Sequence, residues 1–268
     1  MIRRASGRFI ITLSVIASLF MLSGQAAGDS IRDLIAGDGK SARGTWRYKM
    51  TVEIETPEGI KTGSAVREVS AYSLTYSLSG AGGRAKIEKG EAVVVDLGKR
   101  GTVFALMRGI GGDVDYRYSI VFKAFPHERG GLTPEGIQHY REMKSSDKVV
   151  LPVDLYPMFV RFRDMNDPKT VENLLETEAV GQGWPKKNKL KADHFEEAFG
   201  EGVRIKSVTM EMTEEEVNWQ GIEKWLPWLS EYYGKTLDGQ RYHTIKSQFP
   251  FANSLGTGSF STGGYNGQ

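Results

Sequence analysis

The clearest pattern in the chain is an alternation of apolar and polar residues between positions 45 and 55. Every second residue is apolar, namely Trp46, Tyr48, Met50, Val52 and Ile54. A period of two is typical of a strand with one buried face. Thr56-Pro57-Glu58-Gly59 then carries Pro and Gly where a tight turn needs them, and a second strand-like run follows over 60–70. The pattern predicts an antiparallel hairpin.

A second hairpin is predicted by two nearly continuous apolar runs, over 91–97 and 102–107, on either side of Gly98-Lys99-Arg100-Gly101. Strands that are apolar on both faces usually lie inside a sheet that is covered on both sides. We expect further strands over 116–125, 148–151, 158–163 and 203–212. No strand–helix–strand alternation is present, so the early strands are expected to form an antiparallel meander.

Helix signals are fewer. Thr133-Pro134-Glu135 offers a cap, a proline at the first helical position and an acidic first turn, which predicts a helix to about 145. A short helix is expected over 193–199, with Gly200 as its left-handed cap. The run over 221–233 has one broad apolar helical face, although Pro227 interrupts it. Segments 74–83 and 181–190 are read as loops, and 164–168 as a turn rich in capping side chains. The expected fold is α+β: a predominantly antiparallel β-sheet or open barrel with two or three short helices.

The first 26 residues have the parts of a secretory signal peptide. Arg3, Arg4 and Arg8 precede an uncharged apolar run over 9–22, and Gly24 and Ala26 stand where signal peptidase needs small residues. The apolar run is shorter than the roughly 20 residues that cross a bilayer, although a retained anchor is the alternative. We expect cleavage near Ala26 and a periplasmic or secreted protein, with no transmembrane span left after cleavage.

The mature chain divides by composition. Residues 27–44 are expected to form a flexible arm, 45–254 a single β-rich domain, and 255–268 a tail rich in Gly and Ser. A subdivision of the domain near 125–133 is left open.

Charge and cysteine content exclude several classes of protein. The signal removes three of the 35 Lys and Arg and none of the 33 Asp and Glu, so the mature chain is close to neutral. This argues against a nucleic-acid-binding protein and a polybasic membrane-surface protein. With no cysteine, the chain has no disulfide, no thiolate metal site and no cysteine nucleophile.

Catalytic and metal-binding motifs are not evident. The four histidines form no metal-ligand spacing, and no serine-hydrolase motif is found. Asp164, Asn166 and Asp167 resemble half of a calcium loop whose Gly and Glu positions are filled by Lys169 and Leu175. No metal and no cofactor are therefore expected, and the catalytic residues of an enzyme cannot be named.

Two weaker signals involve titratable residues. If the protein were a hydrolase, Asp96, Asp164 and Asp167 would be the first candidates for an acid–base pair. His194 stands beside Asp193, Glu196 and Glu197 and could join a site, although a solvated helix face is the favoured interpretation.

Aromatic residues give the candidate binding site. Trp46 and Tyr48 on the first strand, with Trp225, Trp228 and Tyr232 late in the chain, could line a groove for an acyl chain or a peptide. Packing of the same residues in a core is the more common arrangement.

Several phrases of the chain resemble an uncharacterised family of exported, often lipoprotein-like bacterial proteins. They are TVEIETPEGIKTGSAVREV (51–69), GEAVVVDLG (90–98), RFRDMNDPKTV (161–171), FGEGVRIKSVTMEMTEEEV (199–217), LPWL (226–229) and FANSLGTGSF (251–260). The resemblance implies export but transfers no catalytic residues, because that family has no assigned activity. Many of its members carry a lipidated cysteine after the signal, which this chain lacks.

The sequence therefore predicts an exported cell-envelope protein that is a non-enzymatic binding module for a partner or apolar ligand, such as an envelope protein, a peptide or a lipid. A structural or assembly subunit is the first alternative, and a periplasmic hydrolase with an unrecognised carboxylate site is the second.

Overall fold

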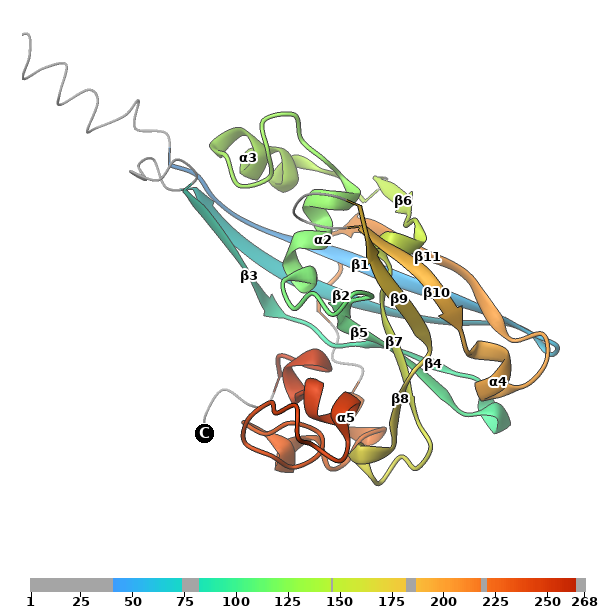
Figure 1. The fold of residues 1–268 in the computed structure, drawn as a ribbon. Helices are drawn as coiled ribbons and strands as arrows, with labels where there is room; N and C mark the ends of the chain where they lie inside the picture. The colour runs from blue at the N-terminus through green and yellow to red at the C-terminus, as the bar shows by residue number, and fades with distance from the viewer. Residues whose placement is uncertain (1–40, 74–81, 146, 182–186, 218–220, 264–268) are drawn as a thin grey trace, which may run out of the picture.

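The computed structural model describes residues 41–73, 82–145, 147–181, 187–217 and 221–263 (Figure 1). The predicted signal peptide, most of the predicted arm, residues 74–81 and 182–186 of the two predicted loops, and the end of the tail lie outside the described residues. The predicted division into domains stays a prediction. The fold is α+β, with antiparallel sheets that do not close into a barrel.

The largest sheet has five antiparallel strands. In spatial order they are β3 (Gly83–Lys89), β2 (Gly59–Ser73), β1 (Arg43–Thr56), β11 (Arg204–Thr213) and β6 (Lys148–Val150). The predicted first hairpin is confirmed, with Thr56 opposite Gly59 at its turn. The Thr56 hydroxyl donates to the Gly59 carbonyl oxygen at 2.7 Å, and Gly59 has φ +112°. The predicted strands over 148–151 and 203–212 are also confirmed.

A second sheet of four antiparallel strands packs under this one. Its strands, in spatial order, are β4 (Val93–Asp96), β5 (Thr102–Gly109), β7 (Pro157–Phe162) and β8 (Val171–Asn173). The predicted β4–β5 hairpin is confirmed, and a single 3-10 turn over Gly98–Arg100 closes it. The two sheets are in close contact at Gly63 of β2, where any side chain would collide with the carbonyl oxygen of Val94.

The four-stranded sheet is the middle layer of the molecule. One of its faces meets the inward residues of β1 and β11 in a first hydrophobic core, which includes Tyr48, Met50 and Met210. Its other face meets the C-terminal segment in a second core, which includes Phe104, Phe162 and Phe260. This explains the continuous apolar sequence of β5, whose residues from Val103 to Met107 are all buried.

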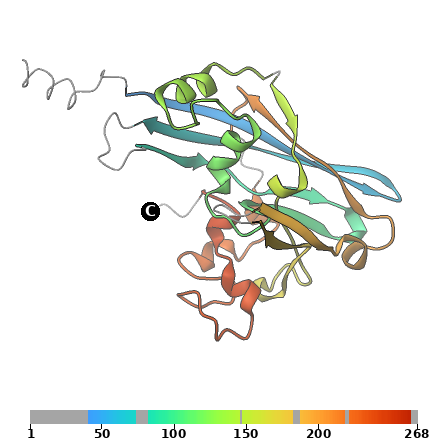
Figure 2. The same cartoon turned by 45° about the horizontal axis from the view of Figure 1, so that its top comes forward.

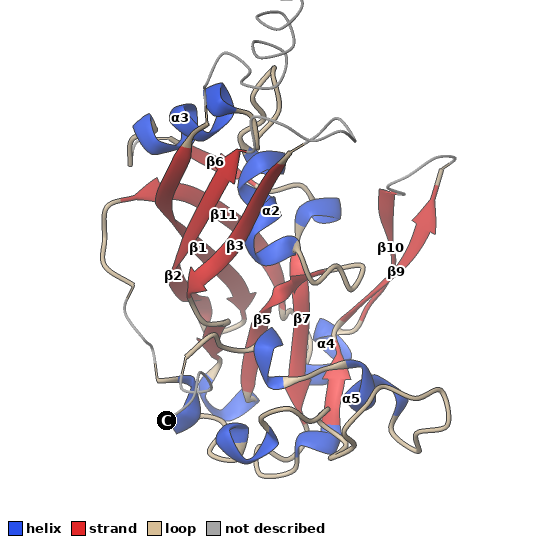
Figure 3. Cartoon of the chain, turned by 90° about the vertical axis from the view of Figure 1, so that its left-hand side faces the viewer, coloured by secondary structure: helices blue, strands red, loops and turns tan. Residues whose placement is uncertain are grey.

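Two helices cover the part of the large sheet that the small sheet leaves open (Figure 3). They are α2 (Tyr116–Ala124) and α3 (Pro134–Glu142). Helix α3 starts as predicted, with Thr133 Oγ1 accepting from the Gly136 amide at 3.1 Å. The predicted strand over 116–125 is wrong, because Tyr116, Ile120 and Val121 lie on one buried side of α2. The predicted five-strand meander is wrong too, because the β1–β2 and β4–β5 hairpins lie in different sheets and the fifth segment is α2.

The C-terminal layer consists of short turns and one short helix, α5 (Pro250–Ser254). The predicted helix over 221–233 is instead two 3-10 turns, Ile222–Lys224 and Leu229–Tyr232, on either side of Pro227. Positive φ angles at Gly221 and Gly234 bound this stretch. The described part of the predicted tail is packed, since Leu255 and Phe260 are fully buried in the second core and a 3-10 turn, Thr257–Ser259, lies between them.

A two-stranded ribbon projects beside the sheets (Figures 2 and 3). It is formed by β9 (Leu175–Val180) and β10 (Lys187–Asp193), so residues 187–190 are a strand and not the predicted loop. Helix α4 (Phe195–Phe199) follows directly, as predicted, and ends at Gly200 with φ +100°. Short 3-10 turns over Val153–Leu155 and Pro168–Thr170 complete the described elements.

No helix among the described residues is both long and apolar enough to span a membrane.

Candidate functional site

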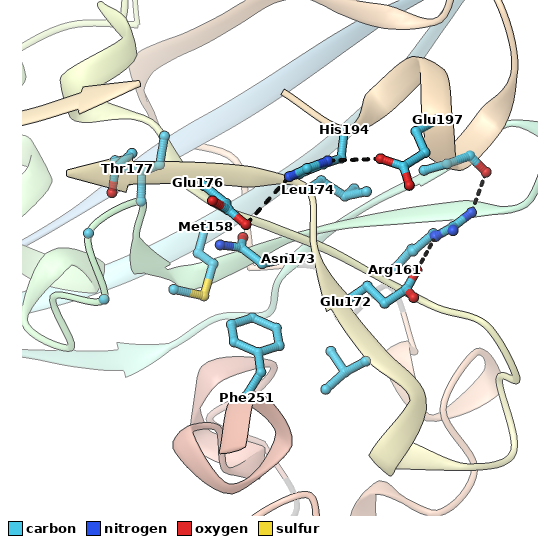
Figure 4. Close-up of a pocket in the computed structure, with 15 residues that line it drawn as sticks. Met158, Arg161, Glu172, Asn173, Leu174, Glu176, Thr177, His194, Glu197 and Phe251 are labelled. Atoms are coloured by element: carbon cyan, nitrogen blue, oxygen red, sulfur yellow. Dashed lines mark hydrogen bonds and ion pairs between the residues drawn. The ribbon is translucent and has the colours of Figure 1, made fainter. Parts of the chain in front are cut away.

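An open pocket of about 680 Å³ lies where the four-stranded sheet, the β9–β10 ribbon and the C-terminal layer meet (Figure 4). Its walls come from segments that are far apart in the sequence: the loop after β5, strands β7, β8 and β9, the start of α4, and α5. A pocket assembled from so many elements has a shape that the whole fold determines.

The polar wall is formed by three titratable side chains, Glu176, His194 and Glu197, and Lys191 lies next to them. His194 Nδ1 lies 3.0 Å from the carboxylate of Glu197, and His194 Nε2 lies 3.6 Å from the carboxylate of Glu176. Lys191 Nζ lies 3.4 Å from the other oxygen of Glu176. Figure 4 shows the imidazole between the two carboxylates.

The backbone explains why these three side chains meet. The His194 amide donates to the Leu174 carbonyl oxygen at 2.9 Å, which joins the end of β10 to the junction of β8 and β9. Glu197 lies three residues further on in α4 and so faces the same side. Glu176 pairs with Ala192 in the ribbon, which places it on the opposite side of the imidazole.

A neighbouring ion-pair network holds the base of the pocket. Arg161 Nε lies 2.8 Å from one oxygen of Glu172, and Arg163 Nε lies 2.8 Å from the other. Arg161 also donates to the Ala198 carbonyl oxygen and stacks over the Phe199 ring at 5.5 Å. Through these contacts, the Arg161 guanidinium holds α4 against β7.

Apolar side chains face the polar row across the pocket. Met158 and Phe251 are the most prominent in Figure 4, and Ile110, Val171 and Leu174 also line the pocket. Between the two walls lies Asn173, whose side-chain Oδ1 is shielded from solvent and has no hydrogen-bond partner among the described residues. A buried acceptor without a donor costs roughly 1–3 kcal/mol, so this position holds unused capacity for a hydrogen bond.

The surroundings of His194 are expected to make the free energy of unfolding depend on pH. The hydrogen bond to Glu197 and the nearby charge of Glu176 raise the pKa of His194 above its ordinary 6.5. A raised pKa means that the stabilisation is complete below pH 6.5 and is lost as the pH rises through the higher value. We expect His194→Gln to be less stable than the wild type at pH 5.5, by less than about 1 kcal/mol because solvent screens the pair, and the gap to close by pH 9.

Urea unfolding of both proteins across this pH range measures the gap. His243→Gln is the matched control, because His243 is exposed and makes no ion pair among the described residues. A gap that stays constant with pH would contradict the assignment of a charged His194.

The aromatic residues predicted to bind a ligand fall into two groups. Trp46 and Tyr48 belong to the first core, where Trp46 stacks on Tyr140 at 5.3 Å and the Tyr48 hydroxyl donates to the Arg117 carbonyl oxygen at 2.7 Å. Burial raises the pKa of Tyr48. Arg67, also fully buried, lies opposite Tyr48 on β2, with its guanidinium 5.9 Å from the Tyr48 ring.

The other group lies on the far side of the middle sheet. Trp228 stacks on Phe162 at 5.4 Å and donates through Nε1 to the Met165 carbonyl oxygen at 2.8 Å. Trp225 and Tyr232 are half-buried at the edge of the same core. The two groups thus belong to separate cores, with the four-stranded sheet between them.

Of the three carboxylates proposed for a hydrolase, Asp96 ends β4, and Asp164 and Asp167 lie in the turn after β7. Asp96, Asp164 and Asp167 accept hydrogen bonds from the amides of Gly98, Asn166 and Lys169 at 2.8, 2.9 and 3.0 Å. The capping interpretation of 164–168 is confirmed. The described residues contain no group of three or more His, Cys, Asp and Glu that could hold a metal ion.

His194 and Glu197 are close in the sequence, where a solvated helix face is the favoured interpretation; the structure places both in the pocket lining. No local sequence pattern marks the other lining residues, because strand pairing and the packing of α5 bring them together. They include Glu176, Asn173, Met158 and Phe251. No family model, curated protein or solved structure matches this chain.

Proposed function

We propose that this chain is an exported cell-envelope protein that binds a small amphipathic ligand in the pocket of Glu176, His194 and Asn173. The observation that carries the proposal is the pairing of two unlike walls, a row of carboxylates and imidazole opposite Met158 and Phe251. Pockets with a few placed polar groups beside apolar surface are typical of ligand sites. Export is supported by the signal-like residues 1–26.

The polar wall favours a ligand that donates hydrogen bonds. A carboxylate has about four acceptor sites, so Glu176 and Glu197 can accept further hydrogen bonds beside their contacts with His194 and Lys191. Asn173 Oδ1 lacks a donor among the described residues. Arg161 is already committed to Glu172 and the Ala198 carbonyl oxygen, so it offers little to an anion. An amine, an amide or a hydroxyl group suits this wall, and an apolar body suits Met158 and Phe251.

This proposal moves the binding site predicted from sequence. A groove shared by Trp46 and Trp228 would require side chains that belong to different cores. The pocket of Glu176, His194 and Asn173, in contrast, combines open volume with polar groups that lie close together. Peptides and amine-bearing lipids both combine hydrogen-bond donors with an apolar body. Two of the partner classes expected from the sequence, a peptide and a lipid, therefore suit this pocket.

Native mass spectrometry tests the proposal. The mature protein is purified from the periplasm without detergent or refolding, and its mass is compared with that of the denatured chain. We expect a reproducible excess mass in the native spectrum. Because a hydrogen bond to a charged group contributes about 1.5–3 kcal/mol, Glu176→Gln is expected to lower the occupancy-derived affinity by about tenfold or more.

Glu178→Gln is the matched control, since Glu178 lies on the same strand outside the pocket lining. It is expected to retain the excess mass. A clean ligand-free mass for the wild type, or equal occupancy in Glu176→Gln and the wild type, would contradict binding at this pocket.

A further inference from the structure

The loop over 239–249 exposes three large apolar side chains at one end of the molecule. Ile245 is 93% exposed, Tyr242 is 70% exposed and Phe249 is 42% exposed. Single exposed apolar residues are common on proteins, but three within eight positions form a concentrated apolar surface. This loop lies in the C-terminal layer beside α5, at the opposite end of the molecule from α3 and β6 (Figures 1 and 3).

A buried polar network gives the loop a defined shape. Asp238 Oδ2 accepts from the Ser247 hydroxyl at 2.5 Å, and Asp238 Oδ1 accepts from the Gln240 amide at 3.1 Å. Asn253 closes the loop from α5: its Oδ1 accepts from the Thr244 amide at 2.6 Å. These hydrogen bonds therefore hold the loop in a conformation that leaves its apolar side chains exposed to solvent.

Cations stand beside each exposed ring. The Arg241 guanidinium lies 5.4 Å from the Tyr242 ring centre, and Lys169 Nζ lies 5.7 Å from the Phe249 ring centre. Lys246 is exposed next to Ile245. Between Gly239 and Phe249 the chain has no Asp or Glu. The surface of the loop is thus both apolar and positive, although the mature chain as a whole is close to neutral.

We propose that the 239–249 loop docks on an anionic lipid bilayer, with Ile245 and Tyr242 entering the interface. Aromatic side chains partition to the level of the lipid headgroups, and Lys and Arg bind anionic headgroups while their stems lie along apolar surface. Charge complementarity favours an anionic lipid surface, because a cation accompanies each of the three exposed apolar side chains. This inference is independent of the pocket of Glu176.

Vesicle sedimentation tests the proposal with the full mature chain. The probes are vesicles of phosphatidylglycerol mixed with phosphatidylcholine, and vesicles of phosphatidylcholine alone. We expect binding to the anionic vesicles only, weakened by added salt. Lys246→Gln is expected to reduce the partition coefficient about fivefold, and Ile245→Ser about tenfold.

Matched controls lie on β6, at the other end of the molecule. Val150 is 64% exposed, and Lys148 is exposed beside it. Val150→Ser and Lys148→Gln remove the same kinds of group and are expected to leave partition unchanged. Because Ile245 and Lys246 are exposed, their variants are expected to fold, and circular dichroism checks this.

Equal binding to both kinds of vesicle would overturn the proposal, and so would unchanged partition of both Ile245→Ser and Lys246→Gln. Cross-linking of the loop to a protein in whole envelopes, without vesicle binding, would also overturn it in favour of a protein partner. Glu176→Gln is expected to bind vesicles normally, which separates this result from the test of the pocket.

Discussion

Replacement of Phe104 by alanine is expected to lower the free energy of unfolding by about 3–5 kcal/mol, the usual range for a buried phenylalanine. Phe104 lies on β5 in the middle sheet, is fully buried, and faces the C-terminal layer. Its ring centre lies 5.7 Å from that of Phe162 and 6.3 Å from that of Phe260. Loss of the ring would leave a cavity between the four-stranded sheet and the C-terminal layer.

Urea unfolding followed by two probes measures this effect. Far-ultraviolet circular dichroism reports the sheets, and tryptophan fluorescence is sensitive to Trp225 and Trp228 in the second core. Tyr233→Ala, at a side chain that is 60% exposed, is the control and is expected to change stability by less than about 0.5 kcal/mol. A loss below 1 kcal/mol for Phe104→Ala would contradict close packing between these layers.

Replacement of Asp238 by alanine is expected to lower the free energy of unfolding by about 3 kcal/mol, because it leaves several buried or part-buried donors unpaired. The donors include the side chains of Thr236, Ser247 and Asn253. Burial opposes ionisation of Asp238, but these hydrogen bonds outweigh it and lower the pKa from 3.8 to about 2. A lowered pKa means that the stabilisation is present above pH 3.8 and is lost as the pH falls toward 2.

The sign is tested with Asp238→Asn, which keeps the size of the side chain and removes its charge. The stability gap between this variant and the wild type should be constant above about pH 4 and shrink as the pH falls toward 2, by about 2 kcal/mol. Asp154→Asn, at an exposed aspartate, is the control. A gap that grows with acidification would refute the network as a stabiliser of the charged form.

The elements predicted well are those that short-range pattern determines. The β1–β2 hairpin combines strict alternation with a Pro and a Gly in the turn, so its register follows from local sequence. The covered β4–β5 hairpin was predicted from its apolar runs, because strands with two buried faces have no polar side. Thr133 and Pro134 identified the start of α3 for the same local reason.

The errors arise where packing overrides local preference. Tyr116 to Phe125 is rich in residues that favour strands, yet the open face of the large sheet needs a helix to cover it, and Tyr116, Ile120 and Val121 supply the buried side. Pro227 has no amide hydrogen to donate, so a continuous helix is disfavoured at this point. The apolar residues on either side of it pack against the middle sheet from two separate 3-10 turns.

The candidate site could be predicted only in part. His194 and Glu197 are neighbours in the sequence, so their contact was visible as a possibility. Glu176 reaches His194 only because β9 pairs with β10, and the sequence of that ribbon lacks a clear alternation. Phe251 arrives from a C-terminal segment whose position depends on the second core. Long-range pairings of this kind leave no local trace.

The position of β11 determines the order in which the chain can fold. β1 is the central strand of the five-stranded sheet, and one of its two neighbours, β11, comes much later in the sequence. Glu53 on β1 and Ser207 on β11 share a hydrogen bond although they are 154 positions apart. Until residue 213 is available, β1 is an edge strand of 14 residues with unpaired amides and carbonyls along one side. Contacts this distant fold slowly. A chain that stops before Arg204 would expose this edge to other copies of itself, so nascent or truncated forms are the species most prone to aggregate.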